Sequence, residues 1–270
     1  MIRTEPICPP LTTLGVDLLA TSRWQRWMAL TRPFAGLSAY VLLAYFEQWW
    51  LAPLVVFLVF VAVVTVTHDV VHGSLGLSRR QTDWALFVCG AILLESGHAY
   101  RTTHCRHHTV FPGDDDPEGD PARMSFWRAV LFGPLFLPRL WCWAFARHKA
   151  NRRERLWLIV EALWAAMVIT AGVVTWRWSA GVLVYAALVI VGSWVYPLLT
   201  VHLPHRHYGD TPLTQTHTLR GRLIPALFLE LTYHLEHHLY PQVPSHHLPE
   251  LSRRLTPLFE EAGVRPIRVP

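Results

Sequence analysis

The sequence predicts an all-α integral membrane protein, and three observations support this prediction. Hydrophobic residues make up 52% of the 270 residues and charged residues only 16%, whereas soluble chains carry about 25% charged residues. The thirteen tryptophans are typical of a protein with wide membrane–water boundaries. Several apolar runs also approach the roughly 20 residues that a membrane-spanning helix needs.

Four apolar segments are predicted to cross the membrane as two hairpins. The predicted spans are the short segment 34–46, then 51–67, a segment that starts at Leu156, and one that runs from Ser179 to about residue 200. Two further stretches, 84–94 and 126–141, are too short or too interrupted by Arg and Pro to span. These two are predicted to be interfacial helices that lie in the membrane surface or dip into it.

Positive charge orients these helices. Of the 24 Lys and Arg residues, 23 fall within 1–33, 68–155 and 201–270, and the turns inside the two hairpins hold only Arg177. Because cytoplasmic loops are enriched in Lys and Arg, both termini are predicted to be cytoplasmic. The chain is predicted to form a single domain, 1–270. It has a transmembrane core of about 34–200, a cytoplasmic insertion of about 68–155 and a C-terminal cytoplasmic segment, 201–270.

Composition also bears on the class of function. A nucleic-acid-binding protein needs a basic patch on a soluble fold, so the apolar runs argue against nucleic acid as a partner despite the formal charge of +5. The four cysteines are widely spaced and form no CxxC pair. They indicate reduced thiols rather than a disulfide framework.

Histidines gather in three tight clusters, HDVVH at 68–72, HCRHH at 104–108 and HLEHH at 234–238. Residues i, i+3 and i+4 of a helix share one face, so each cluster is expected to direct its imidazoles to one place. All three clusters fall on the predicted cytoplasmic side, where they form a histidine-rich cap. Eight imidazoles are too many for one ion and suit two, and imidazole binds Fe, Zn, Cu and Ni. The candidate ligands are His68, His72, His104, His107, His108, His234, His237 and His238.

The order HxxxH, HxxHH, HxxHH around two membrane hairpins resembles the membrane fatty-acid desaturase superfamily, over roughly residues 34–251. HDVVHGSL, LPHR at 203–206 and HLEHHLYPQVPSHHLPEL resemble most the bacterial carotenoid ketolases and hydroxylases, whereas HLEHHLYPQVP also resembles the end of acyl-lipid desaturases. Ser245, His246 and His247 stand where ketolases often have an aromatic pair. The resemblance implies a non-haem di-iron site with two iron ions, O2 as co-substrate, and oxidation of unactivated C–H bonds.

Further site residues are expected near the clusters. The resemblance implies another ligand after the last span, and His205 in the LPHR match is the first candidate; His202 and His207 stay open, and His98 is expected to have a local polar role. A ligating imidazole usually donates its other N–H to a carboxylate or carbonyl. The carboxylates proposed for this role are Asp69, Glu236 and Asp116.

The predicted function is an O2-dependent oxidoreductase of the bacterial inner membrane. Its substrate is expected to be long and apolar, with a carotenoid (hydroxylation or ketone formation) favoured and an acyl-lipid or fatty-acid desaturase as the alternative. A remote alternative is a non-enzymatic metal or haem transporter, although a transporter should place its ligands near mid-membrane. The chain has no GxGxxG and no CxxCH motif, so electrons are expected from a separate protein such as a ferredoxin.

Overall fold

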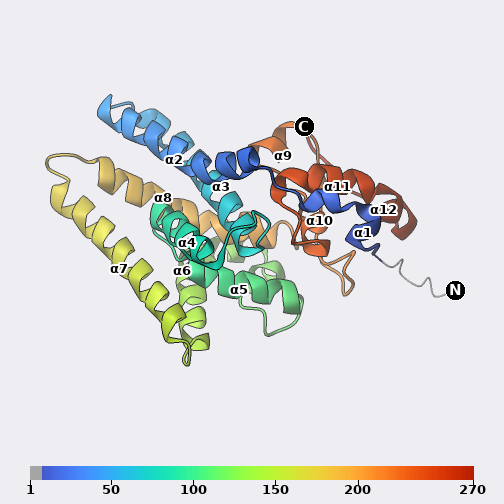
Figure 1. Cartoon of the computed structure of the whole chain (residues 1–270). Coiled ribbons are helices and arrows are strands. Elements are labelled where there is room, and N and C mark those ends of the chain that lie inside the picture. The colour runs from blue at the N-terminus through green and yellow to red at the C-terminus, as the bar shows by residue number, and fades with distance from the viewer. Residues whose placement is uncertain (1–7) are drawn as a thin grey trace.

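The computed structural model describes residues 8–270 and is mainly helical, with almost no strand (Figure 1). The α-helices are α1 Leu11–Leu14, α2 Arg23–Tyr45, α3 Ala52–Val71, α4 Arg79–Leu93, α5 Gly97–Val110, α6 Phe126–Arg147, α7 Arg152–Thr175, α8 Gly181–Pro197, α9 Leu223–Leu227, α10 His234–Leu239, α11 Leu248–Arg254 and α12 Thr256–Ala262. Short 3-10 turns cover Val16–Leu19, Trp49–Leu51, Asp120–Arg123 and Ser245–His247, and a π-helical turn covers Leu198–His202. Strands β1 (Leu219–Arg220) and β2 (Ile267–Arg268) pair in parallel.

Four of the described helices are long and apolar enough to cross a membrane, which agrees with the predicted number. They are Trp49–Val71, which contains α3, then α6, α7, and Gly181–His202, which contains α8. The set differs from the predicted one in two members. The predicted span 34–46 is the second half of α2, which is not among the four, and α6 covers the stretch that was predicted to be interfacial.

Both differences have a physical reason. Pro134 and Pro138 do not break α6, which continues for 22 residues, because a helix in an apolar environment can satisfy the freed backbone groups locally. The expectation that these prolines interrupt the segment was therefore wrong. In α2, the first ten residues include Arg23, Arg26 and Arg32, so only a short apolar stretch remains.

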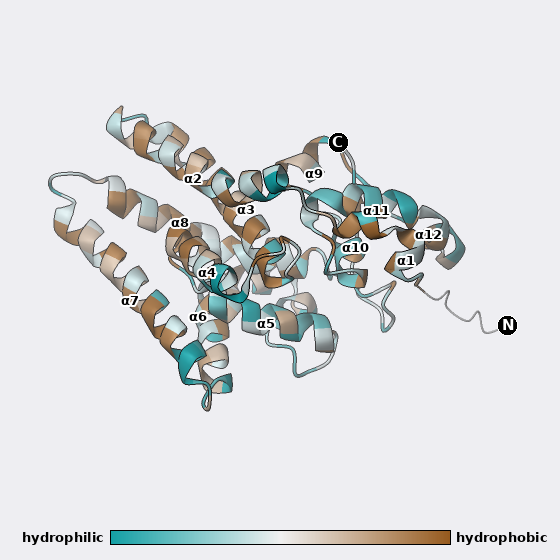
Figure 2. Cartoon of the chain, viewed as in Figure 1, coloured by the Kyte–Doolittle hydropathy of each residue, from teal (hydrophilic) through white to brown (hydrophobic). Residues whose placement is uncertain are grey.

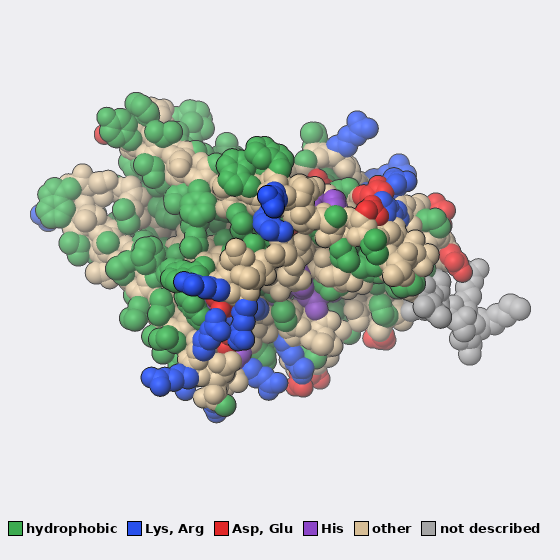
Figure 3. Space-filling view, in the orientation of Figure 1, with side chains coloured by type: hydrophobic (Ala, Val, Ile, Leu, Met, Phe, Trp, Pro, Cys, Tyr) green, Lys and Arg blue, Asp and Glu red, His purple; other side chains and the backbone are tan. Residues whose placement is uncertain are grey.

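The helices of the candidate membrane region expose apolar side chains. Leu131 of α6 is 79% exposed, Leu163 of α7 is 65% exposed, and Trp178 in the turn after α7 is 81% exposed. Figures 2 and 3 show this apolar surface over α2, α6, α7 and α8, whereas the helices near the C-terminus are more polar. A patch of this extent is stable against lipid and is rare on soluble monomers.

Two apolar cores flank the histidine clusters. One lies between α2, α3, α4 and α8 and includes Val59 and Leu86. The other joins Leu18 from the N-terminal segment to α10, α11 and α12 through residues such as Leu248 and Leu255. The end of α3, α5 and α10 meet between these cores (Figure 1), so the histidines lie where the two parts of the chain join.

A buried polar cluster fastens α4, α5 and α7 together. The side chain of Glu161 in α7 is fully buried and accepts hydrogen bonds from Ser96 Oγ and from His98 Nδ1, the latter at 2.7 Å. His98 also stacks on Trp157, with ring centroids 4.8 Å apart. Asp83 of α4 accepts a hydrogen bond from an Arg of α5, Arg101, at 3.0 Å. His98 thus has structural partners of its own in this cluster.

We predict that Glu161→Leu lowers the thermal midpoint of the protein in nanodiscs by about 5 °C or more, because it leaves two buried donors without acceptors. Glu161→Gln should restore much of the loss, since its amide oxygen still accepts. Glu260→Leu, at an exposed position, is the control. Equal midpoints for Glu161→Leu and the control would contradict the structural role of this cluster.

Candidate metal centre

Four segments bring histidines to the junction of the two cores. His68 lies in the last turn of α3 and His72 directly follows that helix. The second box lies within α5 and the third within α10. His205 follows the π-helical turn after α8. Each box therefore lies on a helix or at its end, where the side chains have fixed directions.

The first histidine group consists of five imidazoles. One ring nitrogen from each of four of them lies within 4.8 Å of the others. The fifth, His108, has its Nε2 2.8 Å from Nε2 of His237 and 3.2 Å from Nε2 of His104. The members of the first group are His68, His72, His104, His108 and His237.

The second histidine group consists of four imidazoles. His107, His205 and His238 each offer a nitrogen within 4.8 Å of the others, and Nε2 of His107 is 3.2 Å from Nε2 of His205. His234 joins them, because its Nε2 lies 3.0 Å from Nε2 of His205. All nine histidines proposed from the sequence thus fall into one of two adjoining groups.

The two HxxHH boxes are each divided between the groups, contrary to the expectation that one box serves one place. In α5, His104 and His108 face the first group and His107 faces the second. In α10 the first and last histidines of the box, His234 and His238, face the second group, and His237 faces the first. Residues i+3 and i+4 differ by about 100° around a helix, which is the physical reason for the division.

The electrostatics of the site favour neutral imidazoles. Burial, with a smaller effect of the neighbouring His68, lowers the pKa of His72 to about 2. Burial and then His107 lower the pKa of His234 to about 3. Burial is also the largest cause that holds the pKa values of five other members, His104, His108, His205, His237 and His238, well below their usual range. A neutral imidazole keeps a lone pair for a metal.

Carboxylates and a carbonyl orient several of these rings. Nδ1 of His107 donates to Asp116 Oδ2 at 2.7 Å, and Nδ1 of His104 donates to Glu118 Oε2 at 3.1 Å. Nδ1 of His205 donates to the backbone oxygen of Gln215 at 3.0 Å. In each case the outer nitrogen is fixed as a donor, so the Nε2 lone pair faces the group.

Glu118 was missed by the sequence analysis, which proposed only Asp116 from the acidic loop GDDDPEGDP. Its carboxylate is buried and also accepts from Thr103 Oγ1 at 2.6 Å, and its backbone N–H donates to Asp116 at 2.9 Å. Asp114 and Asp115 of the same run are exposed. The available signal was an acidic residue two positions after Asp116, in the loop that directly follows the second box.

Two of the proposed carboxylates lie differently from expectation. Asp69 accepts from the backbone and hydroxyl of Ser245 at 3.0 and 2.8 Å, and its Oδ1 is 3.6 Å from Nδ1 of His68, beyond good hydrogen-bond distance. Glu236 accepts from Ser252 Oγ and from Arg220 at 3.5 Å, and in residues 8–270 it bonds to no box histidine. Its predicted contact with a ligand is therefore not seen.

The histidines left open in the sequence lie outside both groups. Nδ1 of His202 donates to the backbone oxygen of Pro121 at 2.8 Å. His207 is exposed, and its Nε2 accepts from Arg206 at 3.1 Å.

The donor set fits two transition-metal ions. Nε2 of His72 and of His238 is buried without a hydrogen-bond partner among the described residues, although buried polar atoms are normally paired. The Nε2–Nε2 separations of 2.8–3.2 Å match imidazoles that share an ion, because metal–nitrogen bonds of about 2.1 Å place neighbouring ligand atoms roughly 3 Å apart. An all-imidazole set suits Fe, Zn, Cu and Ni.

Comparison with known proteins gives the family. Residues 47–269 match the fatty acid desaturase family. The chain is 23% identical over 257 residues to dihydrorhizobitoxine desaturase of Bradyrhizobium elkanii, covering 80% of this chain and 70% of that protein. It is 29% identical over 201 residues to the beta-carotene ketolase of a Paracoccus species, covering 70% of this chain and 73% of the relative. It is 29% identical over 211 residues to the sphingolipid delta(4)-desaturase/C4-monooxygenase of Bos taurus, covering 73% of this chain and 61% of that protein.

The family match spans well over half of the chain, and the named relatives are desaturases and oxygenases. This confirms the superfamily predicted from the histidine boxes. With its apolar helices and its two histidine groups, the chain is an integral membrane oxidoreductase that belongs to the fatty acid desaturase family.

Proposed function

We propose that this protein is a membrane-bound di-iron oxygenase that uses O2 and external electrons to oxidise C–H bonds of a long apolar substrate. The observation that carries the proposal is the pair of adjoining, all-histidine groups at the end of the apolar helices. A single group would suit a structural metal, whereas two groups side by side suit chemistry that needs two metal ions. The transporter alternative is not retained, because the family and its named relatives are oxidoreductases.

A carotenoid is the favoured substrate class. The relative that is a beta-carotene ketolase supports it, together with the HDVVHGSL and LPHR stretches. The desaturase relatives keep acyl-lipid or fatty-acid desaturation as the alternative. The name of the sphingolipid relative combines desaturase and monooxygenase activity, so both reaction outcomes stay open for this chain.

The chain's own part in the reaction is positioning and exclusion of water. Iron in both groups would supply O2 activation and the strong oxidant that an unactivated C–H bond requires. Asp116 and Glu118 hold two rings in place, and burial lowers the pKa values of seven of the nine imidazoles. Electrons are proposed to come from a separate protein such as a ferredoxin, which would meet the basic cytoplasmic face.

The meeting of the boxes also bears on topology. Three apolar helices, α6, α7 and α8, lie between the second box and His205. His107 and His205 adjoin and therefore lie on one side of the membrane, so an even number of these helices crosses. α6 is the least apolar of the three. We propose that α7 and α8 cross as a hairpin, that α2 and α3 form the other, and that α6 lies in the interface.

We further propose that residues 1–270 work as one domain in a bacterial inner membrane, with both termini and the histidine groups in the cytoplasm. The site itself supports one domain, because α3 and α10 supply the same group and neither core holds a complete site alone. The concentration of Arg and Lys on that side supports the orientation.

This topology predicts the labelling of single cysteines by a membrane-impermeant maleimide in intact bacterial cells. In a variant whose other cysteines are Ser, the exposed Cys105 should react only after permeabilisation. Trp178 lies in the turn after α7, which this topology places outside the cytoplasm. A cysteine introduced by Trp178→Cys should therefore react in intact cells. Reaction of Cys105 from outside would contradict the cytoplasmic site.

The metal assignment predicts loss of iron when one ligand from each group is removed. His237→Ala should lose iron from the first group and His107→Ala from the second, so bound iron per chain falls by about one or more from about two. Exposed His207→Ala is the control and should keep both. Metal analysis of the purified variants measures this directly, and full iron in both variants would refute the assignment.

The same variants test the substrate class in a carotenoid-producing host. The parent protein and His207→Ala should yield oxygenated carotenoids, while His237→Ala and His107→Ala should yield none. Fatty-acid profiling of the same cells distinguishes the alternative, because new double bonds in acyl chains without carotenoid products would favour an acyl desaturase.

Glu118 provides a finer prediction. Glu118→Gln weakens the acceptor for His104 Nδ1, and loss of such partners typically lowers metal affinity about 10–100-fold. Asp114→Asn, at a fully exposed neighbour in the same loop, should leave the affinity unchanged. Competition with an iron chelator compares the two, and identical curves would show that Glu118 does not support the site.

A further inference from the structure

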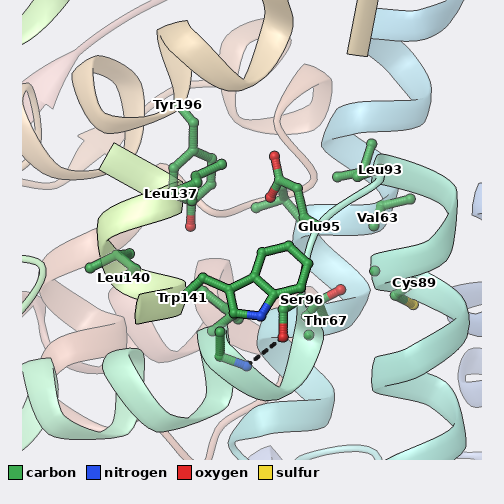
Figure 4. A pocket seen from close by; sticks show the side chains of 15 residues that line it. Val63, Thr67, Cys89, Leu93, Glu95, Ser96, Leu137, Leu140, Trp141 and Tyr196 are labelled. Atoms are coloured by element: carbon green, nitrogen blue, oxygen red, sulfur yellow. Dashed lines mark hydrogen bonds between the residues drawn. The ribbon is translucent and has the colours of Figure 1, made fainter. Parts of the chain in front are cut away.

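An apolar pocket adjoins the first histidine group. Its wall includes Val63, Leu93, Leu137, Leu140, Trp141 and Tyr196, from α3, α4, α6 and α8 (Figure 4). Two further lining residues connect it to the metal ligands. Thr67 directly precedes His68, and Tyr100 stacks on His104 with ring centroids 4.7 Å apart. An apolar chain in this pocket would therefore reach the side of the site that the first group occupies.

One acidic side chain, Glu95, points into this pocket (Figure 4). α4 ends at Leu93, and Leu94 adopts a left-handed conformation, so the chain turns sharply and the N–H of Glu95 donates to the carbonyl of Gly90 at 2.9 Å. The turn is tightly packed, because a Cβ at Gly90 would lie 2.6 Å from the carbonyl oxygen of Glu95. The backbone thus fixes the direction of the carboxyl.

The carboxyl of Glu95 lacks a partner, unlike its neighbours. Its Oε1 is buried with no hydrogen bond, and no other residue of the pocket wall has such an atom within the described part of the chain. The hydroxyl of Ser96, the next residue, accepts a hydrogen bond from the N–H of Ala99 at 2.9 Å and donates one to Glu161. A buried polar atom without a partner is costly, and here it faces the space that a ligand would fill.

The protonation state of Glu95 limits which ligand can pair with it. Burial raises the pKa of Glu95 to about 8, so the carboxyl is protonated at neutral pH and offers one O–H donor. A donor in an apolar pocket favours an uncharged oxygen acceptor. A free carboxylate is disfavoured, because transfer of an ionised group from water to this pocket costs far more than transfer of a ketone or ester.

We propose that Glu95 donates a hydrogen bond to an uncharged oxygen, as in a ketone, ester or hydroxyl group, of a long apolar molecule held in this pocket. Among long apolar molecules, carotenoids included, the bond selects those that already carry an uncharged oxygen over plain hydrocarbons and over free fatty acids. It also sets which carbon of the chain lies beside the first histidine group. This inference rests on the proposed function, because it concerns the substrate of that site. The test below measures binding alone and does not require catalytic turnover.

The test is equilibrium binding to the full chain in nanodiscs, with empty nanodiscs subtracted. The probes are a radiolabelled long-chain dialkyl ketone and the alkane of equal length. The parent protein should bind the ketone about tenfold more tightly than the alkane. Glu95→Leu should remove this preference and leave alkane binding unchanged. Glu95→Gln should keep most of it, because the amide N–H still donates, and Glu47→Leu, exposed in the turn after α2, should keep all of it.

A second measurement covers the case in which Glu95→Leu fails to fold. The infrared carbonyl band of the bound ketone should lie at lower wavenumber in the parent than in lipid alone, and the shift should change in Glu95→Gln. Equal binding of ketone and alkane by the parent, or an unshifted band, would overturn the proposal. Iron content, measured on the same samples, separates this result from the metal assignment: a protein with full iron and no ketone preference refutes only the role of Glu95.

Discussion

The fold is organised around nine imidazoles that meet with their lone pairs turned toward one another. His68 and His237 are 169 residues apart in the chain, yet their Nε2 atoms lie 2.8 Å apart. Neutral imidazoles at such distances cannot all satisfy one another as donors and acceptors, since each has one N–H. Cations between them would resolve the conflict, so we expect metal binding and the association of the two apolar cores to be coupled.

The layer behind the histidines shows how the chain holds them. The acidic loop after α5 places two buried carboxylates, Asp116 and Glu118, against rings of both groups. Asp69 acts differently, because it binds Ser245 of the C-terminal segment beside the first box. Glu236 likewise fastens α10 to α11 through Ser252. Carboxylates inside the boxes thus join chain segments, whereas the carboxylates of the loop after α5 orient histidine rings.

The gathering of the nine histidines could be predicted from the sequence, because residue type and spacing are both visible in the chain; their role as metal ligands stays a prediction. The sequence did not predict how the boxes are shared, since a shared helical face at i, i+3 and i+4 is about 100° wide and can serve two neighbouring places. Glu118 was missed for a related reason. Its role depends on how the loop folds back onto α5, a long-range packing choice that local pattern does not encode.

The membrane helices show the same limit. Length and composition identified α3, α7 and α8, but they do not tell whether an apolar helix crosses the bilayer or lies beside helices that do. α2 has too few apolar residues in its first half to be recognised in this way, although it packs along α3. The information that is missing is tertiary: which helix covers which, and on which side the histidines must meet.

α6 shows why residues that look like helix breakers were retained in an apolar segment. Gly133 faces α8 where any Cβ would overlap the backbone carbonyl of Trp194, so the glycine permits close approach of the two helices. That approach carries Leu137, Leu140 and Trp141, one to two turns further on, to the wall of the pocket beside the first histidine group. The composition of α6 therefore follows from its position against α8, and the pocket that receives an apolar chain depends on that position.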